Sequence, residues 1–583
     1  MSTRCTMLAT LQILILLIVS TLATSNVKPN FVIFLADDLG IGDIGCFGND
    51  TIHTPAIDSL AKEGAKLTHN LVAAPTCSPS RAALLTGRYP IRSGMASALA
   101  QGVLSMITTT DCKAGLPRNE TTFAELVKAA GYATAIIGKW HLGTNLDSSS
   151  DHYFYPVNQG FDYFYGMPTT LINECGPDGR YIAWFIQKRL IMGCCLWSLA
   201  YAVVLVVLHL LGVLGRRGVI IIGFHIVLWL GWNYASHTVL FRQFMCVLVK
   251  NHDVIEQPVV LDTISTRMVN QANSFMERSA TQGPFLLYFS FLQTHTALFN
   301  MKNFTGSSKH GKYGDNVEEM DWMVGKVLSK LSELGLAENT FIYFTSDHGG
   351  ALKEVSVLPP RVGEREGGWN GIYKGGKGQN WEGGIRVPTV VRYPPMIPRG
   401  IEISVPTSTM DVFPTIASLA GVDLPSDRVI DGRDLMPLLR GTMKAPPHDY
   451  LFHYCGQWLN AVTFTSQKDN AIYKLHYVTP NIPAGETDCN RTMYCPCIGD
   501  ETTRHDPPLV FDLRRDPAEQ RPLPATNDQI WNIISRVDEA ISQHRRSIVP
   551  VAHQITKETL AGSFWRQPCC NFPFCSCQED ENT

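Results

Sequence analysis

Two short runs of apolar, β-branched and aromatic residues, each followed closely by acidic residues, most constrain the fold of this chain. One is 30–36 (NFVIFLA), which runs into Asp37 and Asp38, and the other is 340–345 (TFIYFT), which is followed after one serine by Asp347. Continuous apolar runs of this length are typical of strands buried on both faces of a parallel sheet. Open α/β sheets collect ligands at the carboxyl ends of such strands. We therefore expect two strands, far apart in the sequence, to deliver their carboxylates to one site.

These acidic residues predict a divalent cation. Carboxylates that meet in a dry site repel one another unless a cation lies among them. Ca²⁺, which takes several oxygen ligands, is the expected ion, and Mg²⁺ is the alternative. Taken alone, the adjacent pair Asp37 and Asp38 is more typical of a turn or a helix cap, so the prediction depends on the rest of the site.

A cysteine motif supplies much of that site. Cys77 is followed by Pro79 and Arg81, in a run that continues as AALLTGRYP to Pro90. The pentapeptide alone arises often by chance, but the longer run resembles the first long motif of the type I sulfatase family. In that family the motif cysteine is oxidised in the endoplasmic reticulum to Cα-formylglycine by a formylglycine-generating enzyme. The resemblance implies that the hydrate of this aldehyde at Cys77 is the nucleophile: one hydroxyl attacks sulfur, and collapse of the other expels sulfate.

Further motifs of the same family follow in order along nearly the whole chain, among them 138–143 (GKWHLG) and 383–388 (GGIRVP). The resemblance implies a set of metal ligands, which are Asp37, Asp38, Asp347 and His348 together with the formylglycine at Cys77. It also implies a set of catalytic residues, which are Cys77, Arg81, Lys139, His141, His295 and Lys377.

The family pattern gives each of these side chains a role. Arg81 and Lys139 contact the formylglycine, while His141 holds its hydroxyl. His295 and Lys377 contact the sulfate and protonate the leaving alkoxide or phenoxide. His348 departs from the asparagine or glutamine that several family members carry at this position.

The N-terminus and the cysteines indicate an oxidising compartment. Residues 1–25 read as a cleaved signal peptide, because Arg4 precedes the apolar run 7–22 and small residues follow it. The chain has 16 cysteines, crowded toward its C-terminal end, which favours disulfides over a zinc site and leaves their pairing open. Four Asn-x-Thr sequons suit the same compartment, at Asn49, Asn119, Asn303 and Asn490.

Two long apolar runs interrupt the middle of the chain. Residues 190–215 and 219–240 each exceed the about 20 residues that cross a bilayer, and Arg216 and Arg217 lie in the polar turn between them. A buried pair of helices inside a globular core is the alternative.

We predict that 187–242 forms a transmembrane hairpin. Motif residues lie on both sides of it and must meet in one site, so both of its ends must emerge into the lumen, with the turn in the cytosol. Cys175 and Cys246 flank the hairpin and can pair at its base. This insertion narrows the resemblance to the steryl-sulfatase, or arylsulfatase C, branch of the family.

The order of strand and helix patterns predicts an α/β fold. The resemblance implies an alkaline-phosphatase-like large mixed sheet between helices, and 122–130 and 315–334 read as amphipathic helices. A small antiparallel-sheet subdomain is expected to follow, with strands near 471–478 and 509–513 and a helix near 528–544. The expected division is signal peptide 1–25, catalytic domain 26–186 plus 243–441, transmembrane hairpin 187–242, and C-terminal subdomain with a Cys-rich tail 442–583.

These patterns together predict a membrane-anchored arylsulfatase that hydrolyses sulfate monoesters. Lys plus Arg total 49 against 52 Asp plus Glu, so the chain lacks the excess of positive charge that would indicate a nucleic-acid partner.

The expected substrate is a small hydrophobic sulfate ester, aryl or steroid, that reaches the site from the lipid bilayer around 190–240. Sulfated sugars are the alternative substrates. The expected location is the endoplasmic reticulum membrane, with the catalytic domain lumenal, and Golgi or lysosome as alternatives. The alternative functions are a phosphohydrolase of the same fold and a non-catalytic membrane glycoprotein.

Overall fold

The computed structural model describes residues 28–100, 105–171, 175, 201, 203–213, 215–235, 246–354, 366–483, 489, 495–572 and 575–579. The predicted signal peptide, much of the predicted hairpin and the sequon at Asn490 lie outside the described residues.

A mixed sheet of eleven strands forms the centre of the fold, in the order β10-β2-β9-β8-β1-β7-β3-β4-β5-β6, with β11 paired to β2. The central strands β8, β1, β7 and β3 run parallel to one another, and β9 joins β8 antiparallel. This confirms the predicted large mixed sheet. The strands are β1 (Asn30–Ala36), β2 (Ala65–Leu71), β3 (Ala133–Gly138), β4 (Tyr163–Gly166), β5 (Leu248–Lys250), β6 (Asp253–Glu256), β7 (Phe285–Ser290), β8 (Thr340–Ser346), β9 (Arg386–Arg392), β10 (Ile401–Ile403) and β11 (Thr407–Ser408).

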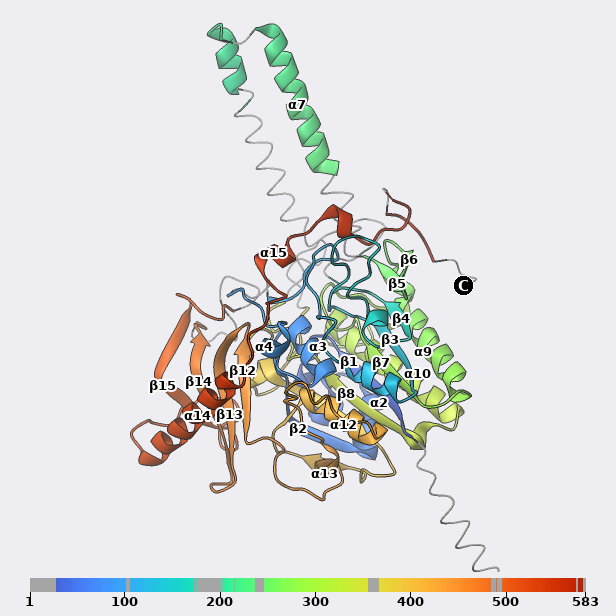
Figure 1. The fold of residues 1–583 in the computed structure, drawn as a ribbon, viewed down its shortest axis with the longest axis vertical. Helices are drawn as coiled ribbons and strands as arrows, with labels where there is room; N and C mark the ends of the chain where they lie inside the picture. The colour runs from blue at the N-terminus through green and yellow to red at the C-terminus, as the bar shows by residue number, and fades with distance from the viewer. Residues whose placement is uncertain are drawn as a thin grey trace, which may run out of the picture.

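Helices cover both faces of this sheet (Figure 1). Alternate residues of β1 point to opposite faces: Phe31 and Ile33 join the core on one face, and Val32 and Phe34 join the core on the other. Both faces of β1 and β8 are therefore buried, which explains their continuous apolar sequence. The helices on the first face include α3 (Cys77–Thr86), α5 (Phe123–Ala129), α12 (Val412–Ala420) and α13 (Met436–Leu439), and those on the second include α2 (Pro55–Glu63), α9 (Ile264–Ala280) and α10 (Gly311–Glu333).

A second, antiparallel sheet follows in the C-terminal part, as predicted. Its order is β12-β13-β14-β15, and one long helix packs on it. The apolar side of that helix, with Ile533 and Val537, closes a separate core against the sheet. These elements are β12 (Tyr450–Cys455), β13 (Trp458–Ser466), β14 (Ala471–Pro480), β15 (Thr502–Asp512) and α14 (Asp528–Arg546). Further α-helices whose bounds the structure describes are α4 (Pro90–Ser93), α7 (Arg216–Ala235), α11 (Glu382–Ile385) and α15 (Lys557–Leu560).

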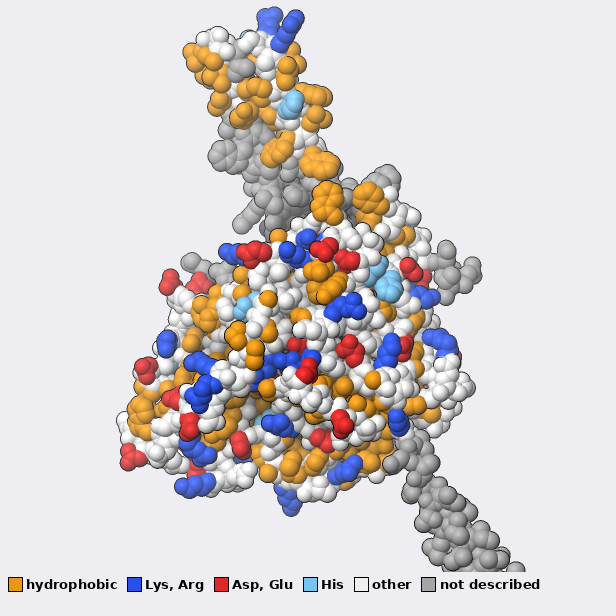
Figure 2. Space-filling view, in the orientation of Figure 1, with side chains coloured by type: hydrophobic (Ala, Val, Ile, Leu, Met, Phe, Trp, Pro, Cys, Tyr) orange, Lys and Arg blue, Asp and Glu red, His pale blue; other side chains and the backbone are white. Residues whose placement is uncertain are grey.

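Helix α7 projects away from the body of the protein (Figure 1). Its side chains are largely exposed, Ile220 and Trp232 by 70% each, and Figure 2 shows apolar side chains along the projection with basic ones at its far end. Within the described ranges, no helix combines the length and the hydropathy that spanning a bilayer requires.

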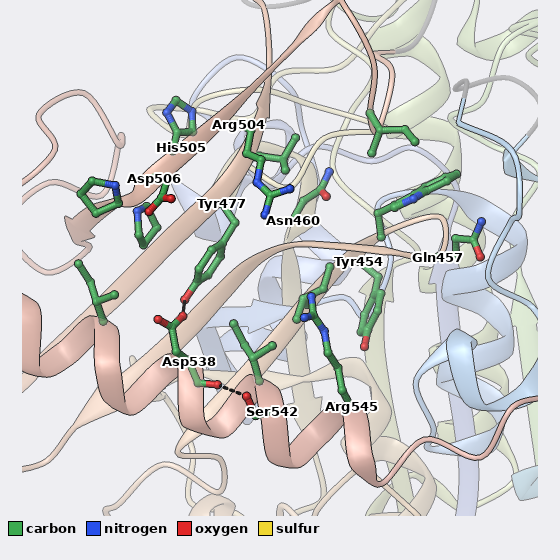
Figure 3. Close-up of a pocket in the computed structure, with 18 of the residues that line it drawn as sticks. Tyr454, Gln457, Asn460, Tyr477, Arg504, His505, Asp506, Asp538, Ser542 and Arg545 are labelled. Atoms are coloured by element: carbon green, nitrogen blue, oxygen red, sulfur yellow. Dashed lines mark hydrogen bonds between the residues drawn. The ribbon is translucent and has the colours of Figure 1, made fainter.

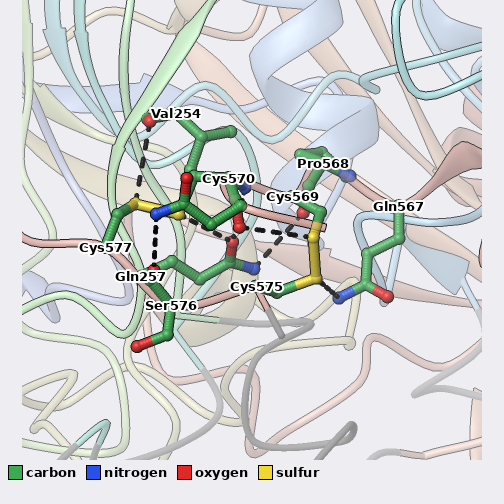
Figure 4. The surroundings of a disulfide bond; sticks show 10 residues. Val254, Gln257, Gln567, Pro568, Cys569, Cys570, Cys575, Ser576 and Cys577 are labelled. Atoms are coloured by element: carbon green, nitrogen blue, oxygen red, sulfur yellow. Dashed lines mark hydrogen bonds between the residues drawn. A yellow bond between two sulfur atoms is a disulfide. The ribbon is translucent and has the colours of Figure 1, made fainter. Parts of the chain in front are cut away.

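Disulfides close the base of this projection and tie down the C-terminal tail. Cys175 and Cys246 are bonded, as the sequence suggested, with Cα atoms 5.6 Å apart. The C-terminal cysteines pair as Cys455–Cys497, Cys489–Cys495, Cys569–Cys575 and Cys570–Cys577. Figure 4 shows the last two, beside Gln257. The backbones of Gln257 and Cys577 exchange hydrogen bonds of 2.9 and 3.0 Å, which fixes the tail to the strand region next to Cys246.

A buried ionic cluster joins the two sheets. The Glu382 carboxylate accepts hydrogen bonds from Lys474 Nζ at 2.9 Å and Arg386 Nη1 at 3.2 Å, and the Glu382 backbone N–H donates to Glu519 at 2.7 Å. Burial raises the pKa of Glu382, but Lys474 and His69 outweigh that effect and hold the pKa well below its usual range. The Glu382 charge is therefore compensated by Lys474 of the antiparallel sheet and by Arg386 at the start of β9.

Removing Lys474 should leave the Glu382 carboxylate buried without its main partner. We expect Lys474→Met to lower the free energy of unfolding by about 3–5 kcal/mol, the cost of breaking a buried ion pair from one side. Chemical denaturation followed by circular dichroism measures it. Lys468→Met is the matched control, because Lys468 is exposed. Equal losses for the two variants would contradict the assigned role of the cluster.

Candidate active site

Four adjacent parallel strands deliver polar side chains to one edge of the large sheet. Asp37 and Asp38 follow β1, and Asp347 and His348 follow β8, its direct neighbour. Lys139 follows β3, on the other side of β7. Because parallel strands end at the same edge, residues from distant parts of the sequence meet there.

Cys77 lies at the centre of this group. It is the first residue of α3 and is fully buried. Its Sγ lies 3.2 Å from His348 Nε2 and 3.9 Å from Asp38 Oδ1. Burial raises the pKa of the Cys77 thiol, so the encoded side chain is protonated in this environment.

Arg81 lies one helical turn after Cys77, on the same face of α3. Its Nε and Nη2 contact Asp347 Oδ2 at 3.0 and 2.9 Å, and its Nη2 lies 3.2 Å from Asp37 Oδ1. The spacing within the cysteine motif thus places a fixed guanidinium between two of the strand-end carboxylates.

Two lysines complete the set of fixed cations. Lys139 Nζ donates to Asp37 Oδ2 at 2.5 Å and to Thr170 Oγ1 at 2.9 Å. Lys377 Nζ donates to Asp38 Oδ2 at 2.5 Å. Burial raises the pKa of Asp37, but the nearby cations, Lys139 first among them, overcome this and hold the pKa well below its usual range. The Asp37 carboxylate is therefore ionised at neutral pH.

The site histidines have distinct surroundings. The Nε2 of His141 lies 2.6 Å from the Ile107 carbonyl, so Nε2 carries the proton and donates it, and Nδ1 is left as a buried acceptor without a partner. Burial holds the pKa of His141 well below its usual range, which keeps the ring neutral. His295 Nε2 lies 3.9 Å from Asp38 Oδ2, the oxygen that Lys377 contacts, and burial lowers the pKa of His295 to about 4.

The geometry around His348 fits a cation. Its Nδ1 donates to the Gly349 carbonyl at 3.0 Å, so the lone pair of Nε2 faces Asp38 Oδ1 at 3.2 Å and Asp347 Oδ1 at 3.6 Å. The Cys77 thiol, 3.2 Å away, can donate to this lone pair, and a metal ion among these atoms would also neutralise the two carboxylates.

Two groups of ligand atoms lie close enough to hold such an ion. They are Asp38, Cys77 and His348, and Asp37, Cys77 and Asp347, with the atoms of each group within 4.8 Å of one another. Asp37 Oδ1 is buried and makes no hydrogen bond; it forms an ion pair with Arg81 Nη2 at 3.2 Å, which leaves a lone pair for a ligand. Aspartate oxygens with one imidazole suit a hard divalent cation. The residues present therefore fit a metal ion.

The backbone at two site residues is strained. Asp38 and His141 both have φ near +60°, in the left-handed region that non-glycine residues rarely adopt. Such conformations persist where the surrounding structure imposes them, and they cluster at functional sites.

The structure brings together the residues that the sequence singled out, and it adds two. Contacts shorter than 4 Å connect Asp37, Asp38, Cys77, Arg81, Lys139, His295, Asp347, His348 and Lys377. His141 donates a hydrogen bond to the carbonyl of Ile107, whose backbone N–H donates to Ser78 next to Cys77. Ser290 Oγ accepts from Arg81 Nη1 at 2.7 Å, and Thr170 holds Lys139. Ser290 is the last residue of β7, whose apolar sequence FLLYF was a usable signal, whereas no motif points to Thr170.

Comparisons with known proteins agree with this geometry. The family model described as Sulfatase matches residues 29–422, and the C-terminal region of aryl-sulfatase matches residues 446–577. The chain is 46% identical over 566 residues to human Arylsulfatase D, covering 95% of this chain and 93% of that protein. It is 46% identical over 562 residues to human Steryl-sulfatase, covering 95% and 94%. Among solved structures, the PsFucS1 sulfatase from Pseudoalteromonas sp. superposes with a TM-score of 0.64 at 26% identity, covering 91% of this chain and 93% of that one.

A divalent cation bound at this site should stabilise the protein by mass action, and Ca²⁺ is the probe for it. We expect the melting temperature to rise as Ca²⁺ is added after EDTA treatment. The free energy of unfolding should increase by about 2.7 kcal/mol when the free Ca²⁺ concentration is 100 times the Kd. Asp38→Asn should remove most of this shift, whereas Asp423→Asn, at an exposed position, should keep it. Thermal scanning fluorimetry measures both. A calcium shift that is the same in the two variants would contradict the assignment of Asp38 as a ligand.

Proposed function

The chain belongs to the sulfatase family, in the branch of steryl-sulfatase and the arylsulfatases, and hydrolyses sulfate esters; from this premise we propose that it cleaves aryl and steryl sulfates at a membrane surface. The observation that carries the proposal is the place of Cys77, buried between Asp38 and His348 and one helical turn from Arg81. Family membership favours sulfate ester hydrolysis over the phosphohydrolase and the non-catalytic glycoprotein.

The proposed nucleophile is derived from Cys77. Sulfatases generally use a formylglycine, and here its hydrate would supply a hydroxyl that attacks sulfur and a second hydroxyl that releases the sulfate. A formylglycine-generating enzyme is accordingly a partner during maturation. His141 Nδ1, the buried acceptor without a partner, can hold one hydroxyl at this position. Arg81 and Lys139 fix the carboxylates around it.

The proposed metal ion is Ca²⁺, held by Asp37, Asp38, Asp347, His348 and residue 77. Bound there, it would stabilise negative charge on the sulfate oxygens. Three carboxylates at the site face three fixed cations, Arg81, Lys139 and Lys377. A divalent ion would therefore leave a net positive site, which attracts the anionic sulfate ester.

Lys377 and His295 are the proposed contacts for the leaving group. Lys377 Nζ and His295 Nε2 both face Asp38 Oδ2, at distances of 2.5 and 3.9 Å. Both can contact the sulfate. His295 is neutral in this environment and its Nδ1 faces the Thr296 carbonyl, so Nε2 has no proton of its own, and the proton that neutralises the leaving alkoxide or phenoxide would come from Lys377 Nζ.

The apolar projection supports a membrane location. The exposed apolar side chains of α7 and the basic residues Arg216 and Arg217 at its start suit a hairpin that enters a bilayer. We propose that 187–242 anchors the enzyme in the endoplasmic reticulum membrane with the catalytic region lumenal, and that hydrophobic sulfate esters reach the site from the lipid. The proposed domains keep the boundaries predicted from the sequence.

Activity should depend on Cys77. Membranes that express the chain with a formylglycine-generating enzyme should hydrolyse a fluorogenic aryl sulfate, and Cys77→Ala should lower kcat by about a thousandfold or more. The matched control is Cys46→Ala, at a cysteine without a disulfide outside the site. Mass spectrometry of the tryptic peptide that contains residue 77 should show the aldehyde. Activity that survives in Cys77→Ala would refute the proposed nucleophile.

The proposed substrate route predicts a selective effect of removing the hairpin. Because the Cys175–Cys246 disulfide holds the flanking backbones together, a short Gly-Ser linker can replace 187–242. Turnover of a water-soluble aryl sulfate should persist, while kcat/KM for a steroid sulfate presented in vesicles should fall about tenfold, since the enzyme loses its high local substrate concentration. Undiminished steroid sulfate turnover by the folded deletion variant would contradict this route.

A further inference from the structure

A second cavity lies in the C-terminal region, outside the active site (Figure 3). It has a volume of about 690 Å³ and lies between the antiparallel sheet and α14. The pairing of β14 with β15 shifts register between His476 and Val478, and Tyr477, at the shift, lines the cavity. The volume falls within the range of about 300–1,000 Å³ that is usual for small-molecule sites.

Two arginines face this cavity from opposite walls. Arg504 comes from β15 and Arg545 from α14, and Figure 3 shows both guanidinium groups turned into the space between sheet and helix. Both residues are exposed, and the described carboxylates form no ion pair with either. Asp538, which also lines the cavity, accepts a hydrogen bond from Tyr477 Oη at 2.6 Å. Two converging guanidinium groups without a partner are suited to an oxyanion, which each can bind through paired N–H groups.

Aromatic side chains form the adjoining walls. Tyr454, Trp458 and Trp531 line the cavity, and the Trp531 side chain is 47% exposed. Rigid rings of this kind supply contact area for a ring-shaped ligand at little cost in side-chain entropy.

One buried polar atom also lacks a partner here. Asn460 is only 5% exposed, and its Nδ2 donates to the Cys497 carbonyl at 2.9 Å. That bond fixes the orientation of the amide, and Oδ1 is left without a hydrogen bond. An unsatisfied buried acceptor is costly, so this position favours a ligand that brings a donor, such as a hydroxyl.

From these features we propose that the cavity is a second binding site, for an organic oxyanion carried on a ring that bears a hydroxyl. The sulfate or carboxylate lies between Arg504 and Arg545, the ring packs on Trp531, and a hydroxyl donates to Asn460 Oδ1. A sulfated saccharide and the sulfate of a steroid that keeps a second, free hydroxyl both have this chemistry. The site uses none of the residues assigned to hydrolysis, and it goes beyond the proposed function.

The test is ligand binding to the full chain, in detergent, carrying Cys77→Ala so that no probe is consumed. The probes are a chondroitin 4-sulfate disaccharide and 17β-estradiol 3-sulfate, which keeps a free hydroxyl, and both are titrated by calorimetry and by tryptophan fluorescence. The double variant Arg504→Gln with Arg545→Gln should weaken binding of at least one probe by about tenfold or more, the effect of losing charge-assisted hydrogen bonds. The probe that responds identifies the source of the ligand.

Arg546→Gln is the matched control, because Arg546 is an exposed arginine next to Arg545 that does not line the cavity. Trp531→Ala should diminish the fluorescence response to the bound probe, with Trp458 as the remaining tryptophan that lines the cavity. With Cys77 restored, the double variant should hydrolyse an aryl sulfate at the unaltered rate, which shows that it is folded. Equal affinities in the double variant and in Arg546→Gln, or no binding of either probe at millimolar concentration, would overturn the proposal.

Discussion

The structure depends above all on the balance of charge within its buried site. Asp37, Asp38 and Asp347 are almost completely removed from solvent, and so are Arg81, Lys139 and Lys377, which contact them. A buried charge that loses its partner destabilises a protein strongly, so each of these residues constrains the others. Strands β8, β1 and β3 of the parallel part of the sheet supply most of them from one edge, and α3 supplies Arg81. The order of the strands and the balance of charge therefore favour the same placement of these six side chains.

A second buried ionic cluster connects the C-terminal region to the active site. Lys474 of β14 and Glu519 contact Glu382, which lies five residues after Lys377 in the same glycine-rich segment. That segment passes through the site: the Lys377 backbone N–H donates to Gly350 and that of Gly378 to Pro75. The antiparallel sheet thereby helps to hold a residue that the family pattern assigns to the sulfate.

Local sequence patterns predicted the parts of the site well because each is a short-range feature. A strand followed by acidic residues, a cysteine one helical turn before an arginine, and a histidine-containing turn all depend on spacing within a few residues. Thr170 could not be found in this way, since its role comes only from the approach of Lys139. The protonated nitrogen of His141 is likewise set by the carbonyl of Ile107, 34 residues away in the chain. The hairpin was predicted from composition, and the described part of it, α7, is exposed and apolar.

The sequence by itself determined the family, the buried strands, the candidate nucleophile and the set of charged residues, because periodicity and motif spacing are written in the order of residues. Only the tertiary structure decided which oxygen each cation contacts, which cysteines pair, and how Glu382 meets Lys474 across two sheets. The cavity between α14 and β15 was likewise decided only by the tertiary structure, since it lies at a register shift between two strands and under a packed helix. Contacts of this kind depend on side-chain directions in space, which distant residues set together and no single segment encodes.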